Sequence, residues 1–237
     1  MTPVIELVAV VKRHGRQRTL DGVDLKLAPG EIVGLCGPSG CGKSTLLRLI
    51  GAVDAPDAGT VAFAGRRVWS GKRRLLPQDG FVMPIFQHPA ASLDARWPLW
   101  RALTEPLWKQ GLDADRRRAA ARAALDSADL REIAVEARPH ELSGGQCQRV
   151  AILRALIAAP KVIIADEPTS ALDAATAVMI RALLVEAARK GTAIVIASHD
   201  INALQEMSDR ILALENGKVA PRAGTRGIPD SIFRKTA

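Results

Sequence analysis

Short apolar segments rich in β-branched residues alternate along the chain with longer segments that carry an apolar residue every three or four positions. Apolar runs of about four to eight residues bounded by Gly or Pro are typical of buried strands, and the longer periodic segments are typical of helices. Strands that alternate with helices favour an α/β fold with a mostly parallel core sheet. The expected strands lie at 4–11, 23–27, 31–36, 60–63, 67–69, 81–86, 161–165 and 192–197, and the expected helices at 43–50, 146–158 and 174–189.

One region departs from this alternation. Residues 98–138 change to a helical pattern rich in Ala, Arg and Leu, which is typical of an inserted lobe. We therefore expect an inserted α-helical subdomain at 88–142, and a catalytic core with an antiparallel β subdomain from residues 1–87 and 143–237. The last stretch, 221–237, is expected to be a loosely held tail.

A glycine-rich loop joins the expected strand 31–36 to the expected helix 43–50 and matches the pattern G-x-x-x-x-G-K-[ST]. Its glycines let the backbone curl so that successive N–H groups point at phosphate oxygens, and the helix start adds the positive end of its dipole. We expect Lys43 to reach the β- and γ-phosphates and Ser44 to be a ligand of Mg²⁺. The pattern predicts a P-loop NTPase with ATP and Mg²⁺ as cofactors. The loop residues expected to bind the nucleotide are Gly37, Pro38, Ser39, Gly40, Cys41, Gly42, Lys43, Ser44 and Thr45.

Two adjacent acids, Asp166 and Glu167, follow the strand expected at 161–165. Because side chains alternate along a strand, the two carboxylates should point in different directions. We assign Asp166 to the metal's water shell and Glu167 to the general base or the orienting group for the attacking water. Two acids at a strand end are also typical of a solvated turn; the glycine loop elsewhere in the chain favours the catalytic interpretation.

The chain is basic overall, with 33 basic and 25 acidic residues among 237 and a net charge of +8. This balance suits anionic partners such as nucleotides, nucleic acid or an anionic membrane face, and it selects none of them. The basic runs are not interleaved with aromatic residues that would stack on bases, and a solvated basic face is the alternative interpretation. They comprise Arg66, Arg67, Lys72, Arg73 and Arg74, and then Arg116, Arg117 and Arg118.

No apolar stretch approaches the ~18–20 residues that span a bilayer, and residues 1–11 lack the parts of a signal peptide. Cys36, Cys41 and Cys147 have no ligand-like spacing, so reduced thiols in a cytosolic protein fit best. Any contact with a membrane is expected to come through a partner or the protein surface.

A short motif, Leu142-Ser143-Gly144-Gly145-Gln146, precedes the expected helix at 146–158. Its N–H groups and hydroxyl at a helix N-terminus form a second anion site. Together with the glycine loop and the two acids, in this order and spacing, it resembles the signature of ATP-binding-cassette (ABC) ATPases across essentially the whole chain. The resemblance implies that two cassettes pack head to tail, with each ATP between one subunit's glycine loop and Ser143, Gly144, Gly145 and Gln146 of the other.

The resemblance also implies roles for four further residues. Gln87 is similar to the glutamine that contacts Mg²⁺ and the attacking water, and Asp173 to the acid of a loop that crosses to the partner subunit. His199 resembles the histidine that contacts the γ-phosphate, and it joins Glu167, Gln87 and Lys43 as an expected catalytic residue. The chain has no tyrosine for the usual aromatic contact to adenine. His14 is the nearest candidate for stacking on the base, and the alternative is that His14 is a solvated loop residue.

The resemblance implies an ATPase subunit that couples dimer closure to solute transport, at the cytoplasmic face of the cell membrane and bound to transmembrane permease subunits. Residues 87–94 resemble the peptide and nickel importer subfamily, so we expect import of peptide, nickel or a metal chelate. An exporter, or a soluble ABC-type ATPase acting on DNA or ribosomes, is the alternative. Long heptad coiled coils and zinc modules, which DNA-acting relatives insert, are missing from the sequence, and we expect no nucleic-acid partner.

Overall fold

The computed structural model describes residues 2–71, 73–75, 81–85 and 92–222. A six-stranded sheet forms its centre, with the strand order β12-β11-β3-β10-β9-β8. All pairings in this sheet are parallel except the one between β11 and β12. The strands are β3 (Ile32–Cys36), β8 (Val82–Ile85), β9 (Val162–Asp166), β10 (Ala193–Ala197), β11 (Arg210–Glu215) and β12 (Lys218–Pro221).

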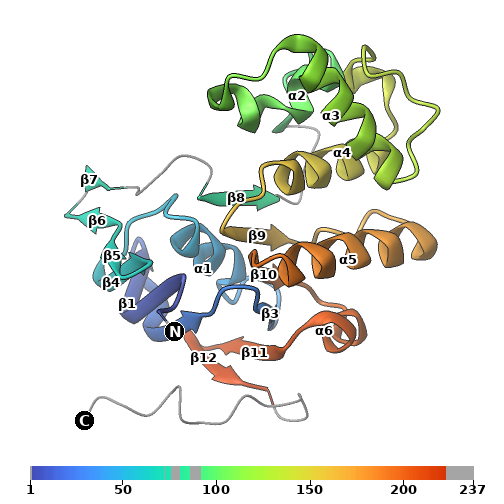
Figure 1. Ribbon diagram of the computed structural model, residues 1–237. Coiled ribbons are helices and arrows are strands. Elements are labelled where there is room, and N and C mark those ends of the chain that lie inside the picture. The colour runs from blue at the N-terminus through green and yellow to red at the C-terminus, as the bar shows by residue number, and fades with distance from the viewer. Residues whose placement is uncertain (1, 72, 76–80, 86–91, 223–237) are drawn as a thin grey trace.

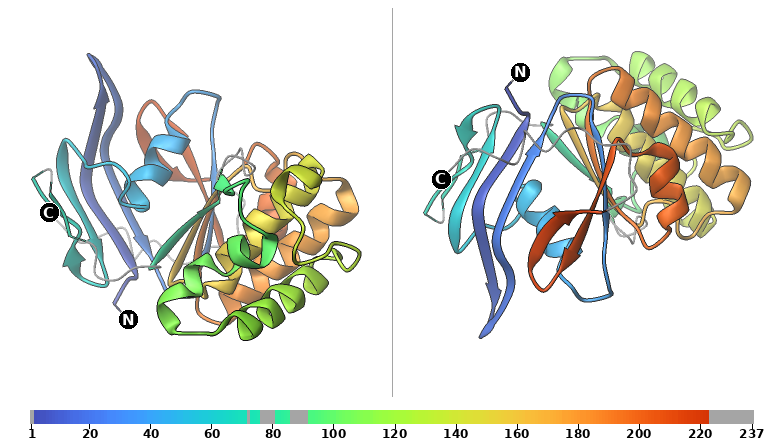
Figure 2. Two further views of the ribbon diagram at one scale, coloured as in Figure 1. Left: turned by 90° about the horizontal axis from the view of Figure 1, so that it is seen from above. Right: turned by 90° about the horizontal axis from the view of Figure 1, so that it is seen from below.

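Helices cover both faces of the core sheet, which explains why β3 and β10 are buried along their whole length. Figure 2 shows α1 (Lys43–Ile50) between this sheet and a second sheet, with α4 (Gly144–Ile157), α5 (Ala174–Arg189) and α6 (Ile201–Met207) on the opposite face. The two faces form separate apolar clusters, one containing Leu46 and Leu49 of α1 and the other containing Ile180 and Leu184 of α5.

The second sheet is antiparallel, with the order β2-β1-β4-β5, and it packs against α1. Its apolar side chains alternate with polar ones, as expected for a sheet with one solvated face. A two-stranded hairpin of β6 and β7 extends beyond its end (Figure 1). The strands are β1 (Ile5–His14), β2 (Gln17–Leu27), β4 (Ala58–Phe63), β5 (Arg66–Arg67), β6 (Trp69–Ser70) and β7 (Arg73–Arg74).

The remaining helical elements form a lobe that packs on α4 around Leu99, Leu103 and Leu125. Trp and Arg side chains are stacked in this lobe: the guanidinium of Arg101 lies 4.4 Å from the ring centre of Trp97, and that of Arg117 lies 5.2 Å from that of Trp100. Such cation–π contacts add to the stability of the lobe. Its elements are α2 (Leu99–Leu103), the 3₁₀ helix η2 (Glu105–Gln110), α3 (Ala114–Ser127) and the 3₁₀ helix η3 (Pro139–Glu141).

The expected fold class is confirmed, and the differences concern individual elements. The expected strand at 67–69 is interrupted: Arg67 ends β5, Trp69 begins β6, and Val68 between them is in the core at 0% exposure. The strands β11 and β12 and the helix α6 were not expected. Pro221 ends β12, so the expected tail begins inside a strand; the rest of that prediction, 223–237, lies outside the described residues, as does Phe86 of the expected strand 81–86.

Candidate nucleotide-binding site

The glycine loop begins where β3 ends, at the carboxyl edge of the core sheet. Gly37 has φ 152°, and a Cβ there would lie 2.4 Å from the carbonyl oxygen of Leu214 on β11. Gly42 has φ 111° and caps α1 in a left-handed conformation. Only glycine fits both positions without strain. The sequence therefore fixes a tight turn from β3 directly into the N-terminus of α1.

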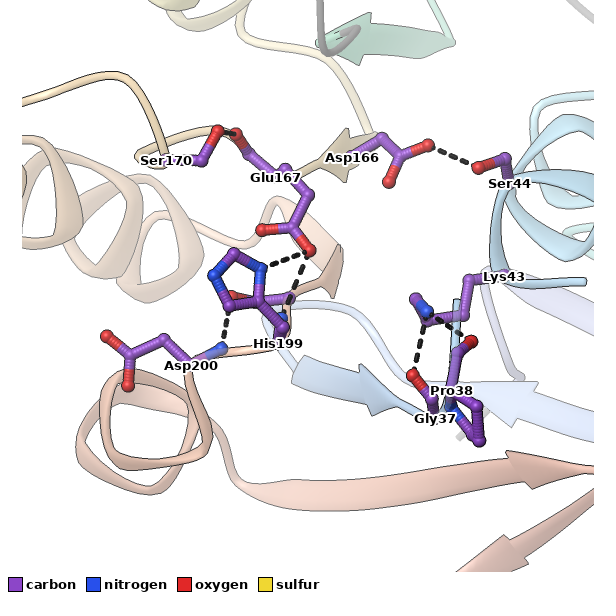
Figure 3. A network of polar contacts seen from close by, with 10 residues as sticks. Gly37, Pro38, Lys43, Ser44, Asp166, Glu167, Ser170, His199 and Asp200 are labelled. Carbon is purple, nitrogen blue, oxygen red and sulfur yellow. Dashed lines mark hydrogen bonds and ion pairs between the residues drawn. The ribbon is translucent and has the colours of Figure 1, made fainter. Parts of the chain in front are cut away.

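The start of α1 is a set of free amide donors. Among the described residues, no backbone carbonyl accepts from the amides of Lys43, Ser44 or Thr45, and no side chain caps the helix. Unpaired N–H groups and the helix dipole together fit a phosphate group. The Lys43 ammonium donates to the carbonyl oxygens of Gly37 at 2.8 Å and Pro38 at 2.9 Å (Figure 3), so its charge lies beside the same loop.

Ser44 and Asp166 face each other across the cleft. The Ser44 hydroxyl donates to Asp166 Oδ2 at 2.6 Å (Figure 3). A hydroxyl and a carboxylate are oxygen ligands that suit Mg²⁺, which usually takes few protein ligands and completes its shell with water and phosphate. In the described part of the chain, no group of three or more His, Cys, Asp and Glu residues could hold a metal ion. The Ser44 hydroxyl and the Asp166 carboxylate fit a magnesium ion that is bound together with a nucleotide, because both are oxygen ligands.

Glu167 points away from Asp166 and toward His199 (Figure 3). The strand β9 ends at Asp166, and Glu167 has φ 51°. A left-handed turn therefore separates the two carboxylates, whereas the alternation of side chains along a strand was expected to separate them. Glu167 Oε1 lies 2.9 Å from His199 Nδ1 and accepts from the His199 amide at 3.1 Å. The Glu167 side chain is 14% exposed and the His199 ring 76%, so the ring can move more freely than the carboxylate.

The loop after Glu167 is held from two sides. The backbone amide of Glu167 donates to Ala197 of β10 at 2.9 Å, and the Ser170 hydroxyl donates to the Glu167 carbonyl at 3.0 Å. The loop ends at Asp173, which caps α5 by accepting from the Thr176 amide at 3.0 Å. This backbone hydrogen bond lowers the pKa of Asp173.

Gln148 is a residue that the sequence analysis did not identify. Its side chain is 1% exposed, and its amide nitrogen donates to the carbonyl of Pro168, directly after Glu167. The contact connects α4, which starts at the signature motif, to the loop that carries Glu167. A glutamine on the buried face of a helix was the available signal, because buried amides are almost always hydrogen-bonded.

The signature residues form a capped helix start of their own. The Ser143 hydroxyl accepts from the Gln146 amide at 3.3 Å, and the Gln146 side chain accepts from the Ser143 amide at 2.8 Å. This reciprocal pair is a capping box. Ser143 and Gly144 are exposed. None of the four residues from Ser143 to Gln146 lines the cleft around the glycine loop.

That cleft has a volume of about 410 Å³ and brings together most of the expected nucleotide site. His14 lies at its edge, with Nε2 3.4 Å from the Thr45 hydroxyl. A larger groove of about 770 Å³ between α3, α4 and α5 has a mainly apolar lining and contains none of these groups. Gln87 lies outside the described residues. The cleft is lined by His14, Gln17, Thr19, Ser39, Gly40, Gly42, Lys43, Ser44, Thr45, Asp166 and Glu167.

Comparison with known families agrees with this geometry. The family model described as ABC transporter matches residues 20–170, which is more than half of the chain. The chain belongs to the ABC transporter family. It carries the family's ATPase domain, and the match includes the glycine loop, the signature motif and the two acids of the cleft.

Among the curated relatives of this ABC chain is the probable D,D-dipeptide transport ATP-binding protein DdpF of Escherichia coli (strain K12), 38% identical over 84% of the chain and 62% of that protein. The di/tripeptide transport ATP-binding protein DppF of Pseudomonas aeruginosa is 36% identical over 88% of the chain and 66% of its own length. The aliphatic sulfonates import ATP-binding protein SsuB 2 of Xanthomonas axonopodis pv. citri is 40% identical over 89% and 67%. The chain thus spans about two thirds of the length of these relatives.

Solved ABC structures have the same fold. The ATP-binding cassette MJ0796, solved as a dimer in a post-hydrolysis state with ADP and Pi, superposes with a TM-score of 0.82 at 33% identity, covering 92% of this chain and 97% of that one. The structure of cbiO1 from Clostridium perfringens, part of the ABC transporter complex cbiONQ, gives a TM-score of 0.79 at 26% identity, covering 93% and 88%. Within the described residues of our chain, no helix is both long enough and apolar enough to cross a bilayer.

Proposed function

We propose that this chain is the ATP-binding and ATP-hydrolysing subunit of an importer of small solutes, located at the cytoplasmic face of the cell membrane. One observation carries the proposal. A single cleft holds the free amides of the glycine loop, the Ser44–Asp166 pair and the largely buried Glu167 carboxylate. Together they supply phosphate binding, a metal site and a base, which are the parts that nucleoside triphosphate hydrolysis requires.

Binding of the triphosphate is the first role of the chain's own residues. Lys43, which donates to two loop carbonyls, exchanges them for the β- and γ-phosphate oxygens, and the free amides of α1 complete the cradle. Ser44 and Asp166 are the residues that would hold Mg²⁺, directly or through its water shell. When bound, Mg²⁺ supplies positive charge to the phosphate oxygens.

Hydrolysis is the second role, and Glu167 is the proposed base. Its carboxylate is largely buried at the rim of the phosphate cleft, where a water held against it would face the γ-phosphate. His199 shares Oε1 of this carboxylate and is exposed, so its ring is free to turn toward the γ-phosphate. Gln87 is proposed, from the family resemblance, to contact Mg²⁺ and the attacking water.

Glu167→Gln tests this assignment, because the amide keeps the size of the side chain and removes the base. We expect the variant to bind Mg-ATP in calorimetry with a Kd close to that of the parent and to hydrolyse it at least about a hundredfold more slowly. Glu132→Gln, at an exposed position in the helical lobe, is the matched control and should change neither. Normal turnover by Glu167→Gln would refute the role of Glu167.

The working form is proposed to be a head-to-tail pair of cassettes. Ser143 and Gly144 are exposed and lie outside the cleft of their own chain, so a second copy can place its signature over the bound nucleotide. Asp173, at the N-terminus of α5, is the proposed crossing contact. The dimeric cassette structure bound to ADP and Pi supports this arrangement by analogy.

Complementation between two inactive variants tests the pairing. Lys43→Ala removes the phosphate lysine, and Ser143→Arg blocks the signature. A mixed dimer retains one intact site, formed by the glycine loop of the Ser143 variant and the signature of the Lys43 variant. We expect mixing to restore a substantial part of the ATPase activity. No recovery in a mixture shown to contain mixed dimers would exclude a shared site.

Peptides are the proposed solutes, with nickel or a metal chelate as the related choice. Two of the reported relatives are named for dipeptide or di/tripeptide transport, and residues 87–94 resemble that subfamily. The proposed partners are transmembrane permease subunits. The test is ATPase activity of the complex reconstituted with its permease subunits, which a dipeptide series should stimulate. Stimulation by an alkyl sulfonate instead would change the solute class and leave the ATPase assignment intact.

A further inference from the structure

Four arginines gather at the outer end of the β subdomain, away from the nucleotide cleft. They are Arg66 and Arg67 on β5 and Arg73 and Arg74 on β7, here called the basic hairpin, and all four are exposed. Figure 1 shows β5, β6 and β7 at the side of the molecule opposite α5. The ATPase chemistry gives these residues no role.

The basic hairpin has no internal charge compensation among the residues that the structure describes. No carboxylate forms an ion pair or a hydrogen bond with any of its four guanidinium groups, although most other arginines of the chain are paired in this way or hydrogen-bonded. The four positive charges lie within residues 66–74, and like charges at neighbouring positions repel one another. An anionic partner would relieve this repulsion.

The backbone that carries the basic hairpin is fixed to the core. Val68, at 0% exposure, donates to Val61 of β4 at 3.0 Å and accepts from the Leu75 amide at 2.8 Å. Trp69 packs against the same apolar cluster and pairs with Arg74 across the hairpin. Because the strands are already ordered, binding would cost little backbone entropy.

We propose that the basic hairpin docks on the phosphate headgroups of an anionic phospholipid surface. Guanidinium groups pair well with phosphate oxygens. Leu75, the residue after Arg74, is 41% exposed, and an apolar side chain beside the arginines favours contact with the lipid interface. Trp69 is partly buried against the core cluster and its indole nitrogen is buried, which limits its use as a platform for base stacking and disfavours single-stranded nucleic acid.

Co-sedimentation of the purified full-length chain with vesicles tests the proposal. The probes are vesicles of phosphatidylcholine alone and of phosphatidylcholine mixed with phosphatidylglycerol. We expect binding only to the mixed vesicles, and weaker binding as salt rises. A basic residue near an anionic membrane contributes about fivefold to binding, so replacing all four arginines by Gln should weaken it by roughly several hundredfold. Leu75→Ser should weaken vesicle binding by a further few-fold while leaving the salt dependence unchanged.

The matched control removes the same total charge from other exposed positions, with Arg131, Lys161, Arg189 and Lys218 replaced by Gln. It should retain most of the vesicle binding. Basal ATPase activity reports folding in both variants; if the hairpin variant loses it, Arg66→Gln with Arg67→Gln and Arg73→Gln with Arg74→Gln are tested as separate pairs.

Three results would overturn the proposal. The first is equal binding to neutral and anionic vesicles. The second is an equal loss of binding in the hairpin variant and the charge-matched control. The third is a preference of the hairpin for duplex DNA over anionic vesicles at the same salt concentration, which would identify a nucleic-acid surface. Because the three binding comparisons do not use ATP, and circular dichroism can replace ATPase activity as the check of folding, failure here is separate from failure of the proposed ATPase function.

Discussion

The turn from β3 into the glycine loop tolerates only glycine at residue 37, and two alanine substitutions can show why. At Gly37, with φ 152°, an added Cβ would lie 2.4 Å from the Leu214 carbonyl oxygen and 2.9 Å from Cys41 Sγ. At Gly40, with φ 75°, nothing lies within 4 Å of the added Cβ. Gly40→Ala therefore carries backbone strain alone, and Gly37→Ala carries strain and a collision.

The magnitudes follow from this difference. A left-handed conformation costs alanine about 1–2 kcal/mol. We expect Gly40→Ala to lower the free energy of unfolding by this amount and no more. The less accessible backbone conformation of Gly37 costs about 1–3 kcal/mol, and overpacking adds about 1–3 kcal/mol more. The Leu214 carbonyl cannot easily retreat, because β11 is paired with β3 directly beside it, with Ala213 opposite Cys36. We expect a total near 4 kcal/mol for Gly37→Ala.

Urea unfolding followed by circular dichroism measures both values. The difference of about 2–3 kcal/mol corresponds to a melting temperature roughly 5–10 °C lower for Gly37→Ala than for Gly40→Ala in a chain of this size. Both variants remove a glycine from the same loop, so entropy changes in the unfolded chain largely cancel. Equal stabilities within about 0.5 kcal/mol would refute the collision at Gly37.

Three further predictions concern the neighbouring contacts. Gln148→Leu should leave the Pro168 carbonyl without its buried donor, lowering the free energy of unfolding by about 1–3 kcal/mol and slowing ATP hydrolysis; unchanged stability and turnover would contradict it. The pKa of Asp173 is lower in the folded protein than in the unfolded chain. The ionised carboxylate therefore stabilises the folded state above the ordinary pKa of about 3.9, and this stabilisation is lost as the pH falls through the lower pKa of the folded state. The melting-temperature advantage over Asp173→Asn, whose cap does not titrate, should therefore shrink below about pH 4, and a constant difference would refute the titration. His14→Ala should raise the Kd for ATP about fivefold if the imidazole stacks on the base, and an unchanged Kd would leave His14 a solvated loop residue.

Local patterns in the sequence were sufficient for the glycine loop and its setting. The expected helices at 43–50 and 174–189 have the same bounds as α1 and α5, and the glycine pattern marks the turn by residue type and spacing alone. The collision that excludes a side chain at Gly37 comes from Leu214 of β11, which no local pattern shows. The strands β11 and β12 were not expected, because they are stabilised by pairing with β3 and with each other. The pairing of β11 with β3, far away along the chain, leaves only a weak local signal. The turn from β11 to β12 did carry a local signal, Asn216-Gly217, which the sequence analysis did not use.

The sequence by itself determined which residues are chemically able to bind phosphate and metal, since that depends on residue type and short-range spacing. Only the tertiary structure decided how they are arranged. Asp166 and Glu167 diverge because a left-handed residue held by the Ala197 carbonyl follows the strand, and Gln148 connects the signature helix to that same turn. The signature at Ser143 lies outside the cleft. Each of these depends on contacts between segments far apart in sequence, which no local pattern specifies.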